Sequence, residues 1–260
     1  MFSKVVKRQL VGIAVLILSA GAMLAPGLAM AQQSNDSYFR VTPYLWMLGL
    51  DGTTAVLGDD ADVDASFSDI LDVLNIALSV NLEWNTRSNW FFVLDPMYAD
   101  LEMDLNVPSP PAPLPVTGKV EIQLIIADAL VGYEFNENIG VYAGARYYDQ
   151  DISIIPDGPV VPEIGLGDDW TDFLLGVRVF GELGEKWTMG GRLDGAVGGD
   201  SDSAFYFQFV FSRIFGRNNN MHLDLGWRYY DVDYISGTGV STFKWDVAHS
   251  GPVVGWSWEF

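Results

Sequence analysis

Four aspartates between positions 58 and 66 form the densest group of possible metal ligands in the sequence. They are Asp59, Asp60, Asp62 and Asp64, in the order Asp-Asp-x-Asp-x-Asp. Carboxylates at such spacing can hold Ca²⁺ or Mg²⁺, but this run lacks the distant Glu that completes a calcium loop. We keep the four residues as a possible divalent-cation loop, with solvated loop acids as the simpler interpretation. No metal is assigned firmly, and no cofactor is predicted.

Catalytic chemistry has few candidates, because the chain holds two histidines and no cysteine. His249 stands beside Ser250 and near Asp246, which is the one plausible constellation. Adjacent residues of a strand point to opposite faces, so His249 and Ser250 diverge unless a bulge intervenes. His222 follows a short predicted turn, far from the outer rim. We therefore predict no catalytic residues.

Charged residues also recur on the polar face of segments in which polar and apolar residues alternate. If these faces enclose an interior, the charges must pair, because an isolated ion in a low-dielectric interior is very costly. The result is either a salt-bridge plug or a narrow, water-filled passage with charged rings. Both alternatives require the same residues, so the sequence leaves both open. We call the charged residues on these interior faces the predicted lumen network. They are Arg146, Arg178, Arg192, Arg228, Glu83, Asp172, Glu182, Asp194 and Asp224.

The composition narrows the class of protein. The 260 residues carry 14 Lys and Arg against 34 Asp and Glu, a formal charge of −20. This charge speaks against nucleic acid, whose phosphates require a basic footprint. The absence of Cys excludes disulfide frameworks, thiol nucleophiles and structural zinc clusters. The hydrophobic content of 49% is too high for disorder, yet after residue 30 no apolar run reaches the roughly 18 residues of a spanning helix.

The first residues have the pattern of an export signal. A basic start with Lys4, Lys7 and Arg8 precedes the apolar stretch Leu10–Leu18, and Ala29-Met30-Ala31 supplies the small residues of a cleavage site. An uncleaved membrane anchor is the alternative, but the apolar core is short. We predict a signal peptide at 1–31 and one exported domain at 32–260.

From residue 38 onward, the period-2 alternation predicts strands that are longer than the roughly 5–6 residues common in soluble proteins. A membrane-crossing strand needs roughly 9–11 residues, and short and long connections alternate as they do in membrane barrels. We predict an all-β fold: a transmembrane, antiparallel, up-and-down β-barrel of about ten strands, with eight as the alternative count. The expected strands are 38–50, 75–85, 89–105, 119–135, 139–155, 169–183, 187–198, 204–215, 221–234 and 242–260.

Two further features belong to this expected barrel. Residues 66–74 read as a short helix in the first outer loop, with Ser66 as its cap and Asp69 in its first turn. Tryptophans are expected to form girdles at the two membrane interfaces. Trp84, Trp90 and Trp187, with the two at the C-terminus, fall at the periplasmic end, and Trp170 and Trp245 fall at the outer end.

The chain ends in Trp256-Ser257-Trp258-Glu259-Phe260, with three aromatic residues on one strand face. Together with the export signal and the alternating strands, this ending resembles the small outer-membrane β-barrel proteins of Gram-negative bacteria. The resemblance implies that Trp256, Trp258 and Phe260 act as the signal read by the barrel-assembly machinery. It also implies outer-membrane lipid and lipopolysaccharide as surroundings.

The strings Pro43-Tyr44-Leu45-Trp46, Gly49-Leu50-Asp51-Gly52 and Phe67-Ser68-Asp69-Ile70-Leu71 resemble a group of uncharacterised proteobacterial barrels. That resemblance implies a location in the cell outer membrane and implies no activity. We therefore expect a non-enzymatic barrel, either structural or a narrow passive channel that favours cations. The alternatives are an outer-membrane enzyme acting on lipid A or peptides, and a barrel that binds divalent cations or other surface ligands.

Overall fold

The computed structural model describes residues 37–56, 59–107, 116–157, 164–216, 218–239 and 242–260. The predicted signal peptide, 1–31, lies outside these residues. In the described part the chain forms twelve strands and one short helix. The elements are β1 (Tyr38–Trp46), β2 (Gly49–Val56), β3 (Asp59–Ala65), α2 (Phe67–Val73), β4 (Leu74–Asn85), β5 (Trp90–Val107), β6 (Val116–Asn136), β7 (Ile139–Pro156), β8 (Ile164–Glu182), β9 (Trp187–Gly199), β10 (Ser203–Phe215), β11 (Met221–Ser236) and β12 (Phe243–Glu259).

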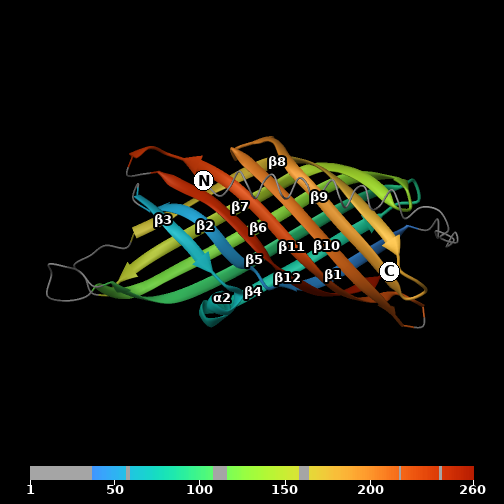
Figure 1. Ribbon diagram of the computed structural model, residues 1–260, viewed down its shortest axis with the longest axis horizontal. Coiled ribbons are helices and arrows are strands. Elements are labelled where there is room, and N and C mark those ends of the chain that lie inside the picture. Colours follow the sequence, from blue (N-terminus) through green and yellow to red (C-terminus); the bar gives the residue numbers. More distant parts are fainter. Residues whose placement is uncertain (1–36, 57–58, 108–115, 158–163, 217, 240–241) are drawn as a thin grey trace. The chain divides into compact units, whose positions relative to one another are not determined.

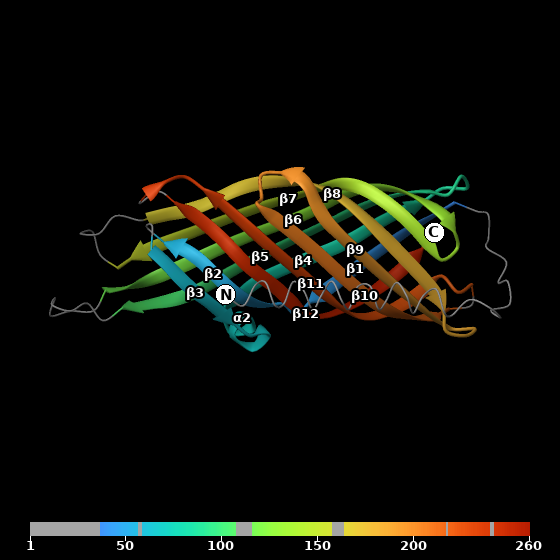
Figure 2. The same ribbon diagram turned by 45° about the horizontal axis from the view of Figure 1, so that its top comes forward.

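Ten of these strands close into an antiparallel barrel (Figures 1 and 2). From β4 to β12 each strand pairs with the next along the chain, and β1 closes the ring by pairing with both β4 and β12. The predicted ten-stranded, all-β barrel with one short helix is therefore confirmed. None of the helices described here is long and apolar enough to cross a membrane.

The connections between strands differ at the two ends of the barrel. At the short-turn end, residues 86–89, 137–138, 183–186 and 216–220 join neighbouring strands. Asn89 with φ 63° and Gly184 with φ 123° allow two of these turns to reverse within a few residues. The longer connections fall at the opposite end, together with the short connection 200–202 between the ninth and tenth strands, and we call this the long-loop end.

The wall of the barrel carries the alternation that its sequence predicts. Along β12 every second residue from Phe243 to Ser257 is buried, and the residues between them are more exposed. Large apolar side chains on the outer surface are widely exposed, among them Leu78 at 62%, Phe173 at 60% and Leu94 at 55%. The apolar residues of this wall thus form an outward-facing surface as well as part of the interior.

Tyrosines mark the border of this apolar surface toward the long-loop end. Tyr98, Tyr147 and Tyr229 each donate a hydrogen bond to the aspartate two residues further along the same strand, at 3.2–3.3 Å. Each of these tyrosines lies on a strand that runs toward the long-loop end, so the carboxylate lies beyond the ring. Toward the short-turn end, Trp84 and Trp90 are 50% and 47% exposed.

The first long connection differs from the prediction. Residues 38–50 were expected as one strand, but the chain breaks at Met47 and Leu48, where β12 changes its partner from β1 to β2. Gly251 lies at this change, and a Cβ atom there would meet the carbonyl oxygen of Met47 at 1.9 Å. The chain then forms the β2–β3 hairpin, which the prediction placed in a loop.

Helix α2 follows this hairpin and agrees with the sequence prediction. The side chain of Ser66 accepts a hydrogen bond from the backbone N–H of Asp69, and the Asp69 carboxylate accepts one from the N–H of Ser66. This reciprocal capping box satisfies two N–H groups that a helix leaves free at its start. Ile70 packs against buried residues of the lumen.

Candidate functional site

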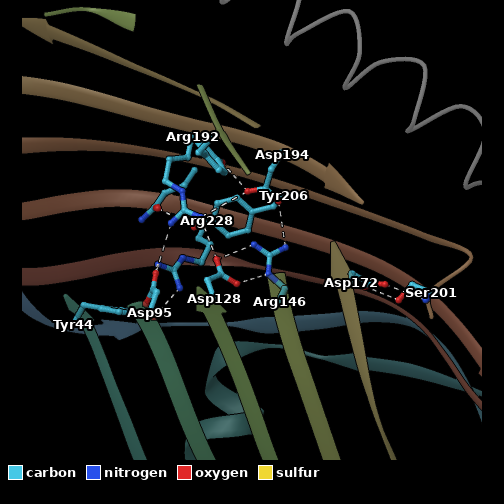
Figure 3. A network of polar contacts seen from close by, with 12 residues as sticks. Tyr44, Asp95, Asp128, Arg146, Asp172, Arg192, Asp194, Ser201, Tyr206 and Arg228 are labelled. Carbon is cyan, nitrogen blue, oxygen red and sulfur yellow. Dashed lines mark hydrogen bonds and ion pairs between the residues drawn. The ribbon is translucent and has the colours of Figure 1, made fainter. Parts of the chain in front are cut away.

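The centre of the lumen is held by ion pairs around Asp128 (Figure 3). Arg146 donates two hydrogen bonds to this carboxylate, from Nε at 2.6 Å and from Nη2 at 2.9 Å. Arg192, from the far side of the barrel, donates a third at 3.1 Å. Paired donors from a planar guanidinium give strong and directional bonds, so Asp128 joins β6, β7 and β9 across the interior.

Asp95 forms the second half of this central network. It accepts hydrogen bonds from Tyr44 at 2.7 Å and from Arg228 at 3.2 Å. Asp95 lies directly opposite Asp128 on the paired strands β5 and β6. Two like charges at such positions repel each other, and the arginines between them make the arrangement stable.

The central charges balance formally, with three arginines against the three carboxylates Asp95, Asp128 and Asp194. Tyr142 donates a hydrogen bond to Asp194 at 2.8 Å, and Arg146 lies 3.5 Å from the same carboxylate. The ring of Tyr206 faces the guanidiniums of Arg146, Arg192 and Arg228, with 4.6, 4.9 and 5.7 Å from carbon Cζ to the ring centroid. These ions are therefore paired and also covered by aromatic rings.

An aromatic layer lies beside this network, toward the long-loop end. Trp170 is stacked between Tyr148 and Tyr234, with ring centroids 4.3 and 4.2 Å apart. His249 is fully buried, and its Nε2 atom lies 2.7 Å from the hydroxyl of Tyr148. Together with Trp46, Trp245 and Tyr230, these rings fill the lumen above the ion pairs.

This layer corrects the prediction for two tryptophans. Trp170 and Trp245 were expected in an outer girdle, but they are 1% and 4% exposed and belong to the lumen. Both lie on strands that extend beyond the apolar surface, where the inner face rather than the outer face takes the large rings. The expected polar lumen is therefore aromatic at this level.

A second set of ion pairs lies toward the short-turn end. Arg178 contacts Glu83 at 3.1 Å and also pairs with Glu134. At the closing strands, Arg40 pairs with Glu259, and His222 Nε2 lies 3.3 Å from the same carboxylate. Charged groups thus bridge the interior at two levels.

One small pocket lies among the side chains at the centre of the lumen. In this lumenal pocket, the centre of a water molecule can occupy a volume of about 10 Å³. This volume is enough for roughly one water. The pocket is lined by Tyr44, Trp46, Asp95, Met97, Ile126, Asp128, Arg146, Tyr206, Arg228 and Tyr230.

The structure places most members of the predicted lumen network inside the barrel. Arg146, Arg178, Arg192, Arg228, Glu83 and Asp194 take part in the ion pairs described above. Asp172 is buried but accepts its hydrogen bonds from Ser201, and Asp224 accepts one from Ser257. Glu182 is a correction, because it is exposed at the last position of β8, where the strand leaves the interior.

Sequence reasoning missed the carboxylates at the centre. Neither Asp95 nor Asp128 belongs to the predicted lumen network. In the structure both lie on the inner face, between buried apolar residues such as Val93 and Ile126. The sequence signal that could have identified them is a single acid on an otherwise apolar strand face, in a barrel whose opposite strands carry arginines.

The four aspartates of the predicted cation loop lie on strand β3 instead of in a loop. Their alternation with apolar residues fits pairing with β2, so Asp60, Asp62 and Asp64 follow one another on one strand face. Lys244 lies 3.4 Å from Asp60. Among the residues described, no group of three or more acidic or histidine side chains is placed to hold a metal ion.

The candidate catalytic constellation does not come together. His249 points into the lumen, whereas the hydroxyl of Ser250 accepts a hydrogen bond from Trp227 on the outer surface at 3.1 Å. The predicted assembly residues lie on the outer surface, with Trp258 37% and Phe260 78% exposed. Trp256 stacks on Phe215 with ring centroids 5.7 Å apart.

Comparisons with known proteins agree on the fold. No family model and no curated protein matches the sequence. Among solved structures, the chain is similar to the outer-membrane protease OmpT of Escherichia coli, with TM-score 0.54, 8% identity, and 87% of this chain and 98% of that chain covered. It is also similar to the translocator domain of the autotransporter NalP of Neisseria meningitidis, with TM-score 0.51, 12% identity, and 99% and 98% covered. This chain has the fold of Gram-negative outer-membrane β-barrels.

Proposed function

We propose that the mature chain is an outer-membrane β-barrel with a closed lumen, which serves as a structural or surface element and does not pass solutes. Its location is supported by the exposed apolar surface between the tyrosine border and the tryptophans of the short-turn end. Amphipathic rings favour the headgroup regions that flank the hydrocarbon core. The short-turn end then faces the periplasm and the long-loop end faces outward.

The side chains that fill the lumen are the observation that best supports a closed barrel. Three arginines and three aspartates form ion pairs across the centre, aromatic rings fill the next level, and the lumenal pocket has room for about one water. A barrel of about ten strands has an interior that side chains can fill, whereas general porins use about 16 strands. Of the two alternatives left open by the sequence, the plug fits this geometry better than the passage.

Fractionation of Gram-negative cells that express the full chain tests the location. The mature protein is expected in the outer membrane, and its migration in SDS gels is expected to change on boiling, because a closed barrel resists SDS until it is heated. Recovery as a soluble periplasmic protein, or in the inner membrane, would contradict the proposal.

Swelling of liposomes that contain the purified protein tests the closed lumen. Vesicles with the native chain are expected to swell in small sugars no faster than empty vesicles. The matched comparison is the double variant Asp95→Ala/Arg228→Ala, which removes one balanced pair and so adds space without adding net charge. Rapid swelling with the native chain would support a channel instead.

A further inference from the structure

The barrel wall is incomplete on one side, between β1 and β4. These strands pair from Tyr38 with Asn85 up to Pro43 with Val80, and the pairing ends there. Beyond this point β1 continues along β12, and β4 continues along β5. Residues 44–48 and 75–79 therefore have no ladder pairing with each other, and we call this unpaired stretch of the wall the side opening.

The exposure of β4 supports this opening. Ala77 pairs with Ala99, whose side chain is buried in the lumen, so both point toward the interior. Ala77 is nevertheless exposed, as are its neighbours Ile76 and Leu78. Both faces of this part of β4 are thus accessible, although elsewhere the inner face of the wall is buried.

Two elements border the opening. Near its narrow end, the hydroxyl of Ser79 donates a hydrogen bond to the backbone oxygen of Tyr44. At its wide end lies α2, which contacts β2, β3 and β5 and places Ile70 against the buried lumen residues. Leu71, the next residue of this helix, is 53% exposed. The helix therefore covers the top of a gap that no strand closes in the described residues.

The lumenal pocket lies behind this opening. Tyr44 and Trp46 of β1 line it on one side, and Met97, which pairs with Ser79, lines it on the other. Four buried polar atoms on its lining residues have no hydrogen-bond partner among the residues described: Trp46 Nε1, Arg146 Nη1, Arg228 Nε and Tyr230 Oη. Three of them can only donate, so an oxygen acceptor fits this pocket.

The level of the opening indicates what can enter it. Leu78 lies opposite Tyr98, which belongs to the tyrosine border, so the opening begins on the apolar surface and ends near that border. Its edges carry the exposed side chains of Leu45, Ile76 and Leu78, which continue the membrane-facing surface.

We propose that this side opening is a binding site for a single-chain amphiphile of the outer leaflet. Its acyl chain lies between β1 and β4 under α2, and one acceptor oxygen of its head reaches Trp46 and Arg228. The small pocket limits the head to one oxygen at this depth. The inference rests on the proposed membrane location but is independent of solute passage, because the ion pairs remain intact.

Photolabelling tests this site with a long-chain fatty acid that carries a diazirine on its chain. The native protein is reconstituted in phospholipid vesicles, irradiated, and the labelled residues are identified by mass spectrometry. Labels are expected to concentrate on β4 residues 75–79 and on α2. The variant Ala77→Trp, which fills the opening, is expected to lose this labelling, whereas Leu94→Trp on the same outer surface is expected to keep it.

A second variant pair tests the polar end of the site. Trp46→Phe is expected to weaken fatty-acid binding about fivefold, the effect of one lost hydrogen bond. Trp245→Phe is the matched control, since its buried Nε1 atom also lacks a partner but does not line the pocket. Labels spread evenly over the apolar surface, or equal binding by both variants, would overturn the inference and leave the membrane location standing. Absence of labels from the whole apolar surface would contradict the location as well.

Discussion

Asp128 connects two arginines inside a barrel that leaves little room for water, so each charge depends on its neighbours. Removing one member of a buried ion pair strands the other in a low-dielectric interior, which costs about 3–5 kcal/mol. We expect Arg146→Met to lower the free energy of unfolding by this amount, because Asp128 loses two of its three hydrogen bonds. Urea unfolding in lipid vesicles measures the change.

Two comparisons make this prediction specific. Arg213→Met changes an exposed arginine on the outer wall and is expected to have a much smaller effect. The double variant Arg146→Met/Asp128→Asn restores charge balance and is expected to be more stable than Arg146→Met alone. Equal stability of Arg146→Met and Arg213→Met would show that the central ion pairs are not structural.

Tyr148 and its neighbour Tyr147 offer a second matched comparison. The hydroxyl of Tyr148 lies 2.7 Å from the buried ring of His249, whereas that of Tyr147 bonds Asp149 on the outer surface. Removing the buried hydroxyl leaves a polar nitrogen without its partner, which costs about 1–3 kcal/mol. Tyr148→Phe is expected to destabilise the barrel by this amount in urea unfolding, and Tyr147→Phe less. The reverse order would contradict the described lumen.

At the residue scale, the sequence predicted the arginines better than their partners. Arg146, Arg178 and Arg228 stand out because each lies on the polar face of an alternating strand, and all three are buried. Asp95 and Asp128 were missed, because a single acid within an apolar strand face does not by itself reveal its partner. Their ion pairs with Arg192 of β9 form only in the observed strand register, which the sequence does not specify.

Helix α2 depends on its first turn. The hydrogen bonds from the side chain and backbone of Ser66 hold the pKa of the Asp69 carboxyl below its ordinary value. A lowered carboxyl pKa stabilises the helix above the ordinary value near 4 and loses this effect as the pH falls through the lowered value. We expect Ser66→Ala to raise the Asp69 pKa and to speed hydrogen exchange in 67–73 about fivefold. Asp72→Asn is the control, and unchanged exchange in Ser66→Ala would contradict the capping.

The C-terminal strand is the element on which closure depends. The backbone N–H of Phe260 donates to Phe39 at 2.9 Å, and that of Phe39 donates to Phe260 at 3.1 Å. Deleting Phe260 removes this last pair and the exposed terminal ring, so we expect less protein in the outer membrane and more degradation. Phe135→Ala is a matched control, since this ring is also exposed at the short-turn end. Normal surface levels after the deletion would remove the role assigned to the terminal residue.

At the element scale, strand number and order were predictable because alternation and connection length each constrain the count. The β2–β3 hairpin was not, because its aspartate-rich sequence reads as a solvated loop until β12 offers a pairing edge. The side opening between β1 and β4 likewise arises from where pairing stops, at Pro43 and Val80. Proline at that point removes one ladder donor, but the sequence alone does not show which strands diverge.

At the scale of the whole molecule, acidic residues are concentrated at the long-loop end and in the hairpin, whereas the central lumen charges balance. Cation preference was predicted from the overall acidic surplus, but the charges that decide passage are those inside. Arg146, Arg192 and Arg228 offset the three central carboxylates, and the aromatic layer separates them from the acids outside. The net charge of the chain therefore describes its surface rather than a pathway.

Conductance of the purified, refolded protein in planar lipid bilayers tests the closed lumen most directly. The native chain is expected to insert without discrete current steps, because paired charges and stacked rings fill its cross-section. The variant Asp95→Ala/Arg228→Ala, measured under the same conditions, is expected to show small openings. These openings would show that the protein inserts and that its current can be detected. Reproducible, cation-selective steps from the native chain would contradict the closed barrel and establish the channel in its place.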